Sequence, residues 1–285
     1  MKKLLIFLLL LFLSTDALAA YVAVLETMAD GDAKETVDQE KTIVQSSSSV
    51  SQKSSSSVAP PMSSSSAVIP SSSSSKVTEP AEVTKGSITD SRDGQSYKTV
   101  TIGTQTWMAQ NLNYETANSY CYSDTPSNCT KYGRLYTWAA AMDSAGTWSA
   151  NGKGCGYGKT CSPTYPVRGV CPTGWHLPTQ TEWKTLFTAV GGFGTAGTKL
   201  KSTSGWNSSG NGTDDYSFSA LPAGYRGSNG DYAIEGSRAN FWSSTEVNSY
   251  YAYDAYGIYL YDNSDYAYLY SNDKDYGFSV RCVKD

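Results

Sequence analysis

The sequence has little that could carry out acid–base or metal chemistry. Its 285 residues include one histidine, His176. A catalytic interpretation would pair His176 with Glu182, but Glu182 already serves as a helix cap, and no motif marks a serine or cysteine nucleophile. We therefore predict that His176 helps to fix the turn from Trp175 to Pro178. We expect neither catalytic residues nor a cofactor.

Basic stripes and long apolar runs are also missing. The formal net charge is −4, and acidic and basic residues are interspersed in the C-terminal part. A nucleic-acid partner would require a clustered basic surface, so none is expected. Beyond residue 13, no segment is long and apolar enough to cross a bilayer, so we expect no membrane insertion once the N-terminal segment is removed.

The first 20 residues, MKKLLIFLLLLFLSTDALAA, have the pattern of a signal peptide. Lys2 and Lys3 precede an apolar run, Leu4 to Leu13, and small residues follow at the expected cleavage point. The alternative is an uncleaved anchor. The prediction is a secreted or extracytoplasmic cell-surface protein, either free or attached to the envelope.

The composition divides the rest of the chain into three parts. Residues 21–45 form a short acidic segment that is too small to bury a core and is predicted to be disordered. Residues 46–85 form a Ser-rich linker, with 18 serines in residues 46–75. Such a tether has a root-mean-square reach of about 30 Å. A single domain is expected over residues 86–285.

The cysteine count is even, as expected for disulfides in an exported protein. Six cysteines allow 15 pairings, and spacing alone does not choose among them. Two short loops suggest local bridges, Cys121–Cys129 and Cys155–Cys161, and Cys171 and Cys282 would then pair over a long span. The rival interpretation is a metal site, which would need more histidine.

Two short helices and several strands are predicted in the domain. Tyr97–Ile102 and Gln105–Met108 are predicted to form a hairpin, and the alanines of Gly133–Met142 favour a short helix. Thr179 and Glu182 form a capping box. An apolar face follows the box: Trp183, Leu186, Phe187 and Val190. The remaining segments FSALPAGYR, NFWSST and GFSVRCVKD, with the tyrosine-rich segment between the last two, are typical of strands and turns. The fold class is therefore α+β, with long loops between irregular antiparallel strands.

Several ordered motifs carry a family resemblance. The segments IGTQTWMAQNLNY, YGRLYTWAAAM, CPTGWHLPTQTEW, GTDDYSFSALPAGYR, FWSSTE and GFSVRCVKD closely resemble the Fibrobacter succinogenes major paralogous domain. HLPTQTEW is further similar to the formylglycine-generating sulfatase-modifying enzymes. The resemblance implies a C-type-lectin-like fold in which the first and last strands meet. It brings no established activity. The sulfatase-modifying reaction would need a reactive cysteine pair late in the chain, where only Cys282 is found.

The segment from Tyr250 to Tyr270 is the main candidate site, because nine of its 21 residues are tyrosine. Asp262–Asp265 is a strong turn signal. If the turn closes a hairpin, Tyr259 faces Tyr268 and Tyr261 faces Tyr266. Strand alternation then places tyrosines on an outer face and the aliphatic residues on an inner one. The inner set is Ile258, Leu260, Ala267 and Leu269. The predicted ligand-binding residues are Tyr250, Tyr251, Tyr253, Tyr256, Tyr259, Tyr261, Tyr266, Tyr268 and Tyr270.

The function predicted from these features is non-catalytic binding. Tyrosine supplies stiff contact area with a polar tip, as in antibody paratopes. From Glu246 to Asp275 there are six acids and one lysine, which favours a neutral glycan or a surface protein over an anion. The alternatives are a structural sheet, a protein–protein role in a cell-surface assembly, and an enzyme of the sulfatase-modifying type. A segment of this composition also fits a diversified binding face.

A structural calcium ion is a weaker prediction. Its candidate ligands are Asn211, Asp214 and Asp215, or Asp273 and Asp275. Polar turns closed by Asx hydrogen bonds are the competing interpretation of the same residues.

Overall fold

The computed structural model describes residues 83–247 and 252–285. The chain divides into two units, residues 1–73 and 74–285, and every described residue belongs to the second. The predicted signal peptide, the acidic segment and most of the linker, together with Tyr250 and Tyr251, lie outside the described residues. The first strand begins at Val83, slightly before the predicted domain boundary at Gly86.

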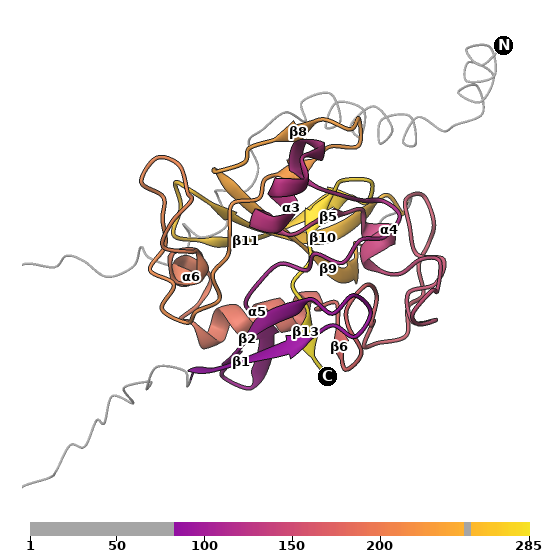
Figure 1. Ribbon diagram of the computed structural model, residues 1–285, viewed down its shortest axis with the longest axis horizontal. Helices are drawn as coiled ribbons and strands as arrows, with labels where there is room; N and C mark the ends of the chain where they lie inside the picture. Colours follow the sequence, from indigo (N-terminus) through magenta and orange to yellow (C-terminus); the bar gives the residue numbers. More distant parts are fainter. Residues whose placement is uncertain (1–82, 248–251) are drawn as a thin grey trace, which may run out of the picture. The chain divides into compact units, whose positions relative to one another are not determined.

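The described domain contains two larger sheets, one two-stranded sheet, four short α-helices and a 3-10 helix at Tyr122–Asp124 (Figure 1). The five-stranded sheet has, in spatial order, β1 (Val83–Thr89), β2 (Ser96–Ile102), β3 (Gln105–Met108), β13 (Val283–Lys284) and β6 (Trp175–His176). The six-stranded sheet has β11 (Ala267–Asp273), β10 (Asp254–Tyr261), β9 (Arg238–Glu246), β12 (Phe278–Ser279), β5 (Leu135–Tyr136) and β4 (Ser119–Tyr120). A separate pair is formed by β7 (Tyr225–Arg226) and β8 (Tyr232–Ala233). The α+β class is confirmed.

The helices are α3 (Pro126–Tyr132), α4 (Trp138–Ala141), α5 (Gln180–Ala189) and α6 (Phe193–Leu200). The predicted capping box of α5 is present, with Thr179 and Glu182 each bonding the other's backbone. Two helices were not predicted. The two glycines of α6 lower its intrinsic helix propensity. Helix α3 has only seven residues and is held to the segment before it by the Cys121–Cys129 disulfide. Of FSALPAGYR, Tyr225–Arg226 forms a strand, and Ala220 and Gly224 make isolated β-bridges to Lys201 and Ala239.

Strand order differs from the expected meeting of the first and last strands. β13 pairs with β3 and β6, so β1 and β13 share a sheet without touching. The β2–β3 hairpin is confirmed in the predicted register, with Ile102 opposite Gln105.

All three predicted disulfides are present: Cys121–Cys129, Cys155–Cys161 and Cys171–Cys282. The last joins the segment before β6 to the segment before β13 across a sequence separation of 111. A bridge that closes so long a loop removes much conformational freedom from the unfolded chain.

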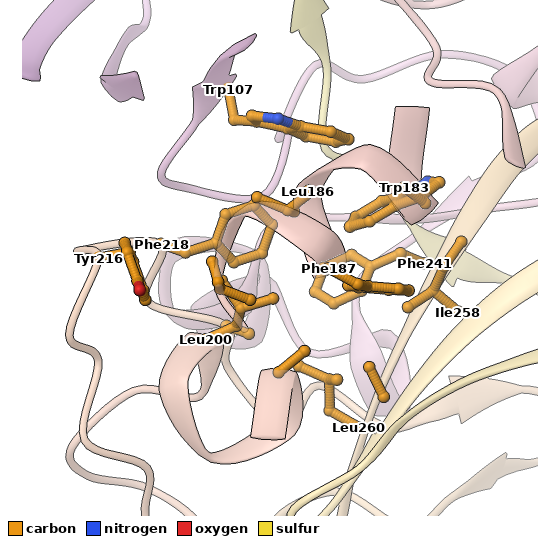
Figure 2. Packing of buried hydrophobic residues seen from close by; sticks show 14 of the residues in the cluster. Trp107, Trp183, Leu186, Phe187, Leu200, Tyr216, Phe218, Phe241, Ile258 and Leu260 are labelled. Atoms are coloured by element: carbon orange, nitrogen blue, oxygen red, sulfur yellow. The ribbon is translucent and has the colours of Figure 1, made fainter. Parts of the chain in front are cut away.

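An aromatic core lies between the sheets. The buried face of α5 presents Trp183, Leu186 and Phe187, which pack between Trp107 of β3 and Phe241 of β9 (Figure 2). Trp107 and Trp183 lie 4.6 Å apart between ring centroids. A second buried cluster contains Trp138 of α4, Trp242 of β9 and Phe278 of β12, together with residues of other strands and of the loops between them.

Arg281, just before β13, is fully buried between these clusters. Its guanidinium donates to Asn111 Oδ1 at 2.6 Å and to the carbonyl oxygens of Met108, Phe218 and Ser219. The cation also lies 4.6 Å from the ring centroid of Phe218.

His176 lies in β6, and its ring bonds to residues outside the turn from Trp175 to Pro178 that it was predicted to fix. Its Nε2 lies 2.8 Å from Glu182 Oε1 and its Nδ1 lies 2.7 Å from Asp285 Oδ1. Burial lowers the pKa of His176, but the hydrogen bonds to the two carboxylates outweigh burial, so the net shift is upward. In its protonated form the ring therefore links Glu182 of α5 to Asp285, the residue after β13.

This arrangement predicts a pH-dependent contribution to stability. A folded-state pKa raised above the unfolded value of about 6.5 gives stability that is complete below that value and lost as pH rises through the folded pKa. We expect His176→Gln to lower the free energy of unfolding most near pH 5–6 and less at pH 9. Urea unfolding across this pH range measures the difference. The same loss of unfolding free energy at every pH would contradict the proposed contribution of protonated His176.

Candidate functional site

The tyrosine-rich segment forms the predicted hairpin. β10 and β11 are antiparallel, with Tyr259 opposite Tyr268 and Gly257 opposite Tyr270. The ladder ends at Leu260 and Ala267, one step before Tyr261 and Tyr266. β11 is an edge strand of the six-stranded sheet, as Figure 1 shows beside α6.

Helix α6 and the residue after it hold the turn of this hairpin. Lys201 Nζ donates to the carbonyl oxygens of Tyr261 at 2.9 Å and Ser264 at 3.1 Å. A Cβ added at Gly197 would lie 2.5 Å from the carbonyl oxygen of Tyr266, so only glycine lets α6 approach this closely. The turn is therefore fixed by packing as well as by its Asp-Asn-Ser-Asp sequence.

Alternation sorts the two faces as predicted, but both faces of β10 are covered. Ile258 and Leu260 belong to the core beside α5. Tyr259 is only 7% exposed and belongs to the second cluster, beside Phe278. Its hydroxyl donates to Asn272 Oδ1. The prediction that Tyr259 lies on an outer, ligand-accessible face is wrong, because Phe278 of β12 and Tyr270 of β11 pack their rings against it and Arg238 of β9 lies 5.2 Å from its ring centroid.

The accessible part of the segment is a row along β11 and its flank. We call Tyr261, Tyr266, Tyr268 and Tyr270 the tyrosine face. Tyr266 is 54% exposed and Tyr270 is 44% exposed, whereas Tyr261 and Tyr268 are half-buried. The sequence therefore predicted correctly that Tyr266 and Tyr270 are exposed and wrongly that Tyr259 is.

The rings of the tyrosine face support one another. Tyr268 and Tyr270 are nearly parallel, with centroids 5.6 Å apart and planes 9° apart. Tyr261 meets Tyr268 edge-on at 5.3 Å. At such separations parallel rings overlap in an offset stack, and each aromatic pair stabilises the sheet by about 0.5–1.5 kcal/mol. Tyr268 is therefore flanked by other rings, and the open ring area belongs mainly to Tyr266 and Tyr270.

Arg238 of β9 contributes a cation to this region that sequence reasoning missed. Its guanidinium lies 4.6 Å from the centroid of Tyr261 and 5.2 Å from that of Tyr259. Burial raises the pKa of Tyr261 and Tyr270, although Arg238 acts in the opposite direction, so the phenols remain hydrogen-bond donors at neutral pH. Arg238 lies opposite Tyr261 in the ladder, a relation that appears only once the register is known.

The other predicted tyrosines are divided among different places. Tyr253 is 41% exposed and stacks on Tyr157 of the loop closed by Cys155–Cys161, with centroids 4.7 Å apart. Tyr256 is half-buried in β10, opposite Ser271. The structure therefore does not gather all of the predicted residues into one surface.

Among the residues predicted as calcium ligands, Asn211, Asp214 and Asp273 accept hydrogen bonds within their own turns, and Asp275 donates one through its amide. Asp214 accepts from the amide and hydroxyl of Ser219, and Asp273 Oδ1 accepts from the amide of Asp275 at 2.8 Å. Asn211 Oδ1 accepts from the amide of Trp206. Among residues 83–247 and 252–285, no three His, Cys, Asp or Glu side chains form a group that could hold a metal ion. The same residues contain no helix able to cross a membrane.

Comparison with known proteins gives one family. Residues 100–284 match the Fibrobacter succinogenes major domain. The chain matches no curated protein and no solved structure.

The difference in burial predicts that substitution of two tyrosines of this hairpin lowers the free energy of unfolding by very different amounts. Tyr259→Ala removes a buried ring and should lower the free energy of unfolding by about 3–5 kcal/mol. Tyr270→Ala removes an exposed ring and should cost about 1 kcal/mol or less. Urea unfolding with the disulfides intact measures both. Equal losses would show that the tyrosine face is as structural as the core.

Proposed function

The chain belongs to the Fibrobacter succinogenes major domain family, and on that premise we propose that it is a non-catalytic binding module whose tyrosine face recognises a neutral glycan. The proposal includes export by the N-terminal signal and presentation, in secreted form or at the cell surface, on the Ser-rich linker. It also includes a C-type-lectin-like arrangement of the domain, which the resemblance in sequence implies.

The observation that carries the proposal is the exposed row on an edge strand. Large exposed aromatic side chains grouped on one surface are characteristic of binding sites, because tyrosine loses little conformational entropy on contact. Tyr266 and Tyr270 offer the most accessible ring area, and the hydroxyl groups of the row suit hydrogen bonds to sugar hydroxyls. The rings are already ordered by their mutual contacts, which reduces the cost of binding.

Charge supports a neutral ligand. Asp262 and Asp265 lie in the turn beside the row, and Asp254 and Asp273 lie opposite each other at its far end. An anionic ligand would meet this acidic rim, whereas hydroxyl groups can donate to the carboxylates.

The state of the cysteines supports a non-catalytic role. All six are paired in disulfides, so the chain has no thiol for the chemistry of the sulfatase-modifying type. Free-thiol titration of the purified protein tests this part of the proposal, and a reactive pair would favour the enzyme instead.

Binding to polysaccharides tests the main proposal. The purified protein should be retained on insoluble cellulose, on xylan or on a glycan array, and Tyr266→Ala plus Tyr270→Ala should weaken retention by at least about tenfold, since two ring contacts are lost. Tyr157→Ala is the matched control, because it removes a comparably exposed phenol, 43% exposed, outside the tyrosine face.

Retention that survives the double substitution would sink the glycan proposal. The second candidate function is a protein–protein role in a surface assembly, favoured by the position of β11 at the edge of the six-stranded sheet. Concentration-dependent self-association in light scattering, abolished by the same double substitution, would support it.

A further inference from the structure

A polar groove lies on other elements of the domain. It consists of two adjoining hollows, of about 270 and about 500 Å³, between the start of β2, the segment after β3, and α3. The hollows share Gln95, Asn113, Cys129 and Thr130 as lining residues. Their size is that of small-molecule sites, and no residue of the tyrosine face lines them.

The walls of the groove are rigid. The Cys121–Cys129 disulfide anchors α3, and Asn111 Nδ2 donates to the carbonyl oxygen of Tyr132 at 2.7 Å. A Cβ added at Gly133 would lie 2.8 Å from both Asn111 Cβ and Leu112 O, so the end of α3 lies directly against the segment after β3. A groove held this way loses little freedom when a ligand enters.

The side-chain amides of two glutamines are oriented so that the oxygen bonds to the protein and the NH₂ group can donate to a ligand. Gln95 Oε1 accepts from the hydroxyl of Tyr97 at 2.7 Å, and Gln110 Oε1 accepts from the amide of Lys98 at 2.7 Å. Because each oxygen is held by the protein, each NH₂ group is left with two donors. Neither NH₂ group bonds to another of the described residues, and both side chains line the smaller hollow.

The remaining lining supplies the complementary groups. Lys98, Lys131 and the hydroxyl of Thr130 add donors to the smaller hollow, and Asp93 and Glu115 line the larger one together with Arg92 and Arg134. Arg134 pairs with Glu115 at 2.6 Å, Arg92 with Asp90 at 2.6 Å and Lys131 with Glu235 at 3.5 Å. Among the described residues, Lys98 and Asp93 are left as charges of opposite sign outside these pairs. A ligand that bridges both hollows therefore needs groups that accept and donate along its length. The hydroxyl groups of a neutral sugar do both. Because most of the charges in the lining are paired within the protein, the groove has little net charge to attract an ionic ligand.

We propose that the polar groove is a second binding site, for a short neutral oligosaccharide held by the amides of Gln95 and Gln110. The site is independent of the tyrosine face, because it uses different elements and a different interaction, hydrogen bonding by oriented amides.

Side-chain amide signals provide a direct test. Cellohexaose and xylohexaose are titrated separately into the ¹⁵N-labelled full-length protein. The Gln95 and Gln110 side-chain NH₂ signals should shift in a saturable way with at least one of them.

Gln95→Glu plus Gln110→Glu is the matched variant. A carboxylate keeps the accepting oxygen for Tyr97 and Lys98 but removes all four donors, so the melting temperature should be unchanged. The affinity should fall by at least about tenfold, as expected for the loss of two or more hydrogen bonds.

The outcomes separate this site from the tyrosine face. Tyr266→Ala plus Tyr270→Ala should leave the titration unchanged. The proposal is overturned by amide signals that do not move with either sugar, by unchanged affinity in the double glutamate variant, or by loss of the titration in the tyrosine variant. A negative result for the groove would not affect the proposed glycan binding by the tyrosine face, which is tested separately by retention on polysaccharide.

Discussion

The constraint on which the domain depends is the buried charge of Arg281. Burial lowers its pKa to about 9, which leaves the guanidinium charged at neutral pH. A cation removed from water is tolerated only when its donors are satisfied, so the chain must bring carbonyl oxygens to it. Met108, Phe218 and Ser219 supply them from distant parts of the sequence, and Asn111 supplies an amide oxygen. The position of Asn111 in turn fixes one wall of the polar groove. Phe241, 5.5 Å from the guanidinium, lies opposite Ile258 beneath the tyrosine hairpin.

In the β10–β11 hairpin one strand is buried in the domain and its neighbour carries exposed side chains. β10 is buried on both faces, with aliphatic residues against the core beside α5 and Tyr259 against Phe278. β11 pairs with it on one side only and leaves Tyr266 and Tyr270 accessible. Contacts among the phenols themselves order the row. The half-buried Tyr261 and Tyr268 also pack against the second cluster, so the exposed row is continuous with the core.

Local sequence signals predicted the elements that depend on local chemistry. The α5 capping box, the β2–β3 turn and the Asp262–Asp265 turn are specified by neighbouring residues, and all are present. The disulfide pairs followed once two short loops were assigned. The predictions failed where the result depends on contacts between segments that are distant in the sequence. The burial of Tyr259 depends on β9 and β12, which lie beside it only in the folded sheet. Arg238 and the polar groove have no local signature, because their partners come from separate strands and from α3, whose helix the sequence only weakly favours.

The first strand has a mechanical consequence. β1 pairs with β2 alone, and most of its side chains are exposed. Val83, its first residue, lies opposite Ile102, at the end of the ladder away from the Thr89–Ser96 pair beside the turn. A pull that enters from the N-terminal side would therefore load the β1–β2 hydrogen bonds one after another, as a zip, rather than all together. Peeling the seven residues of β1 releases roughly 24 Å of chain, at about 3.4 Å per residue. The strand can thus yield under tension before the Cys171–Cys282 bridge or the aromatic core bears any of the load.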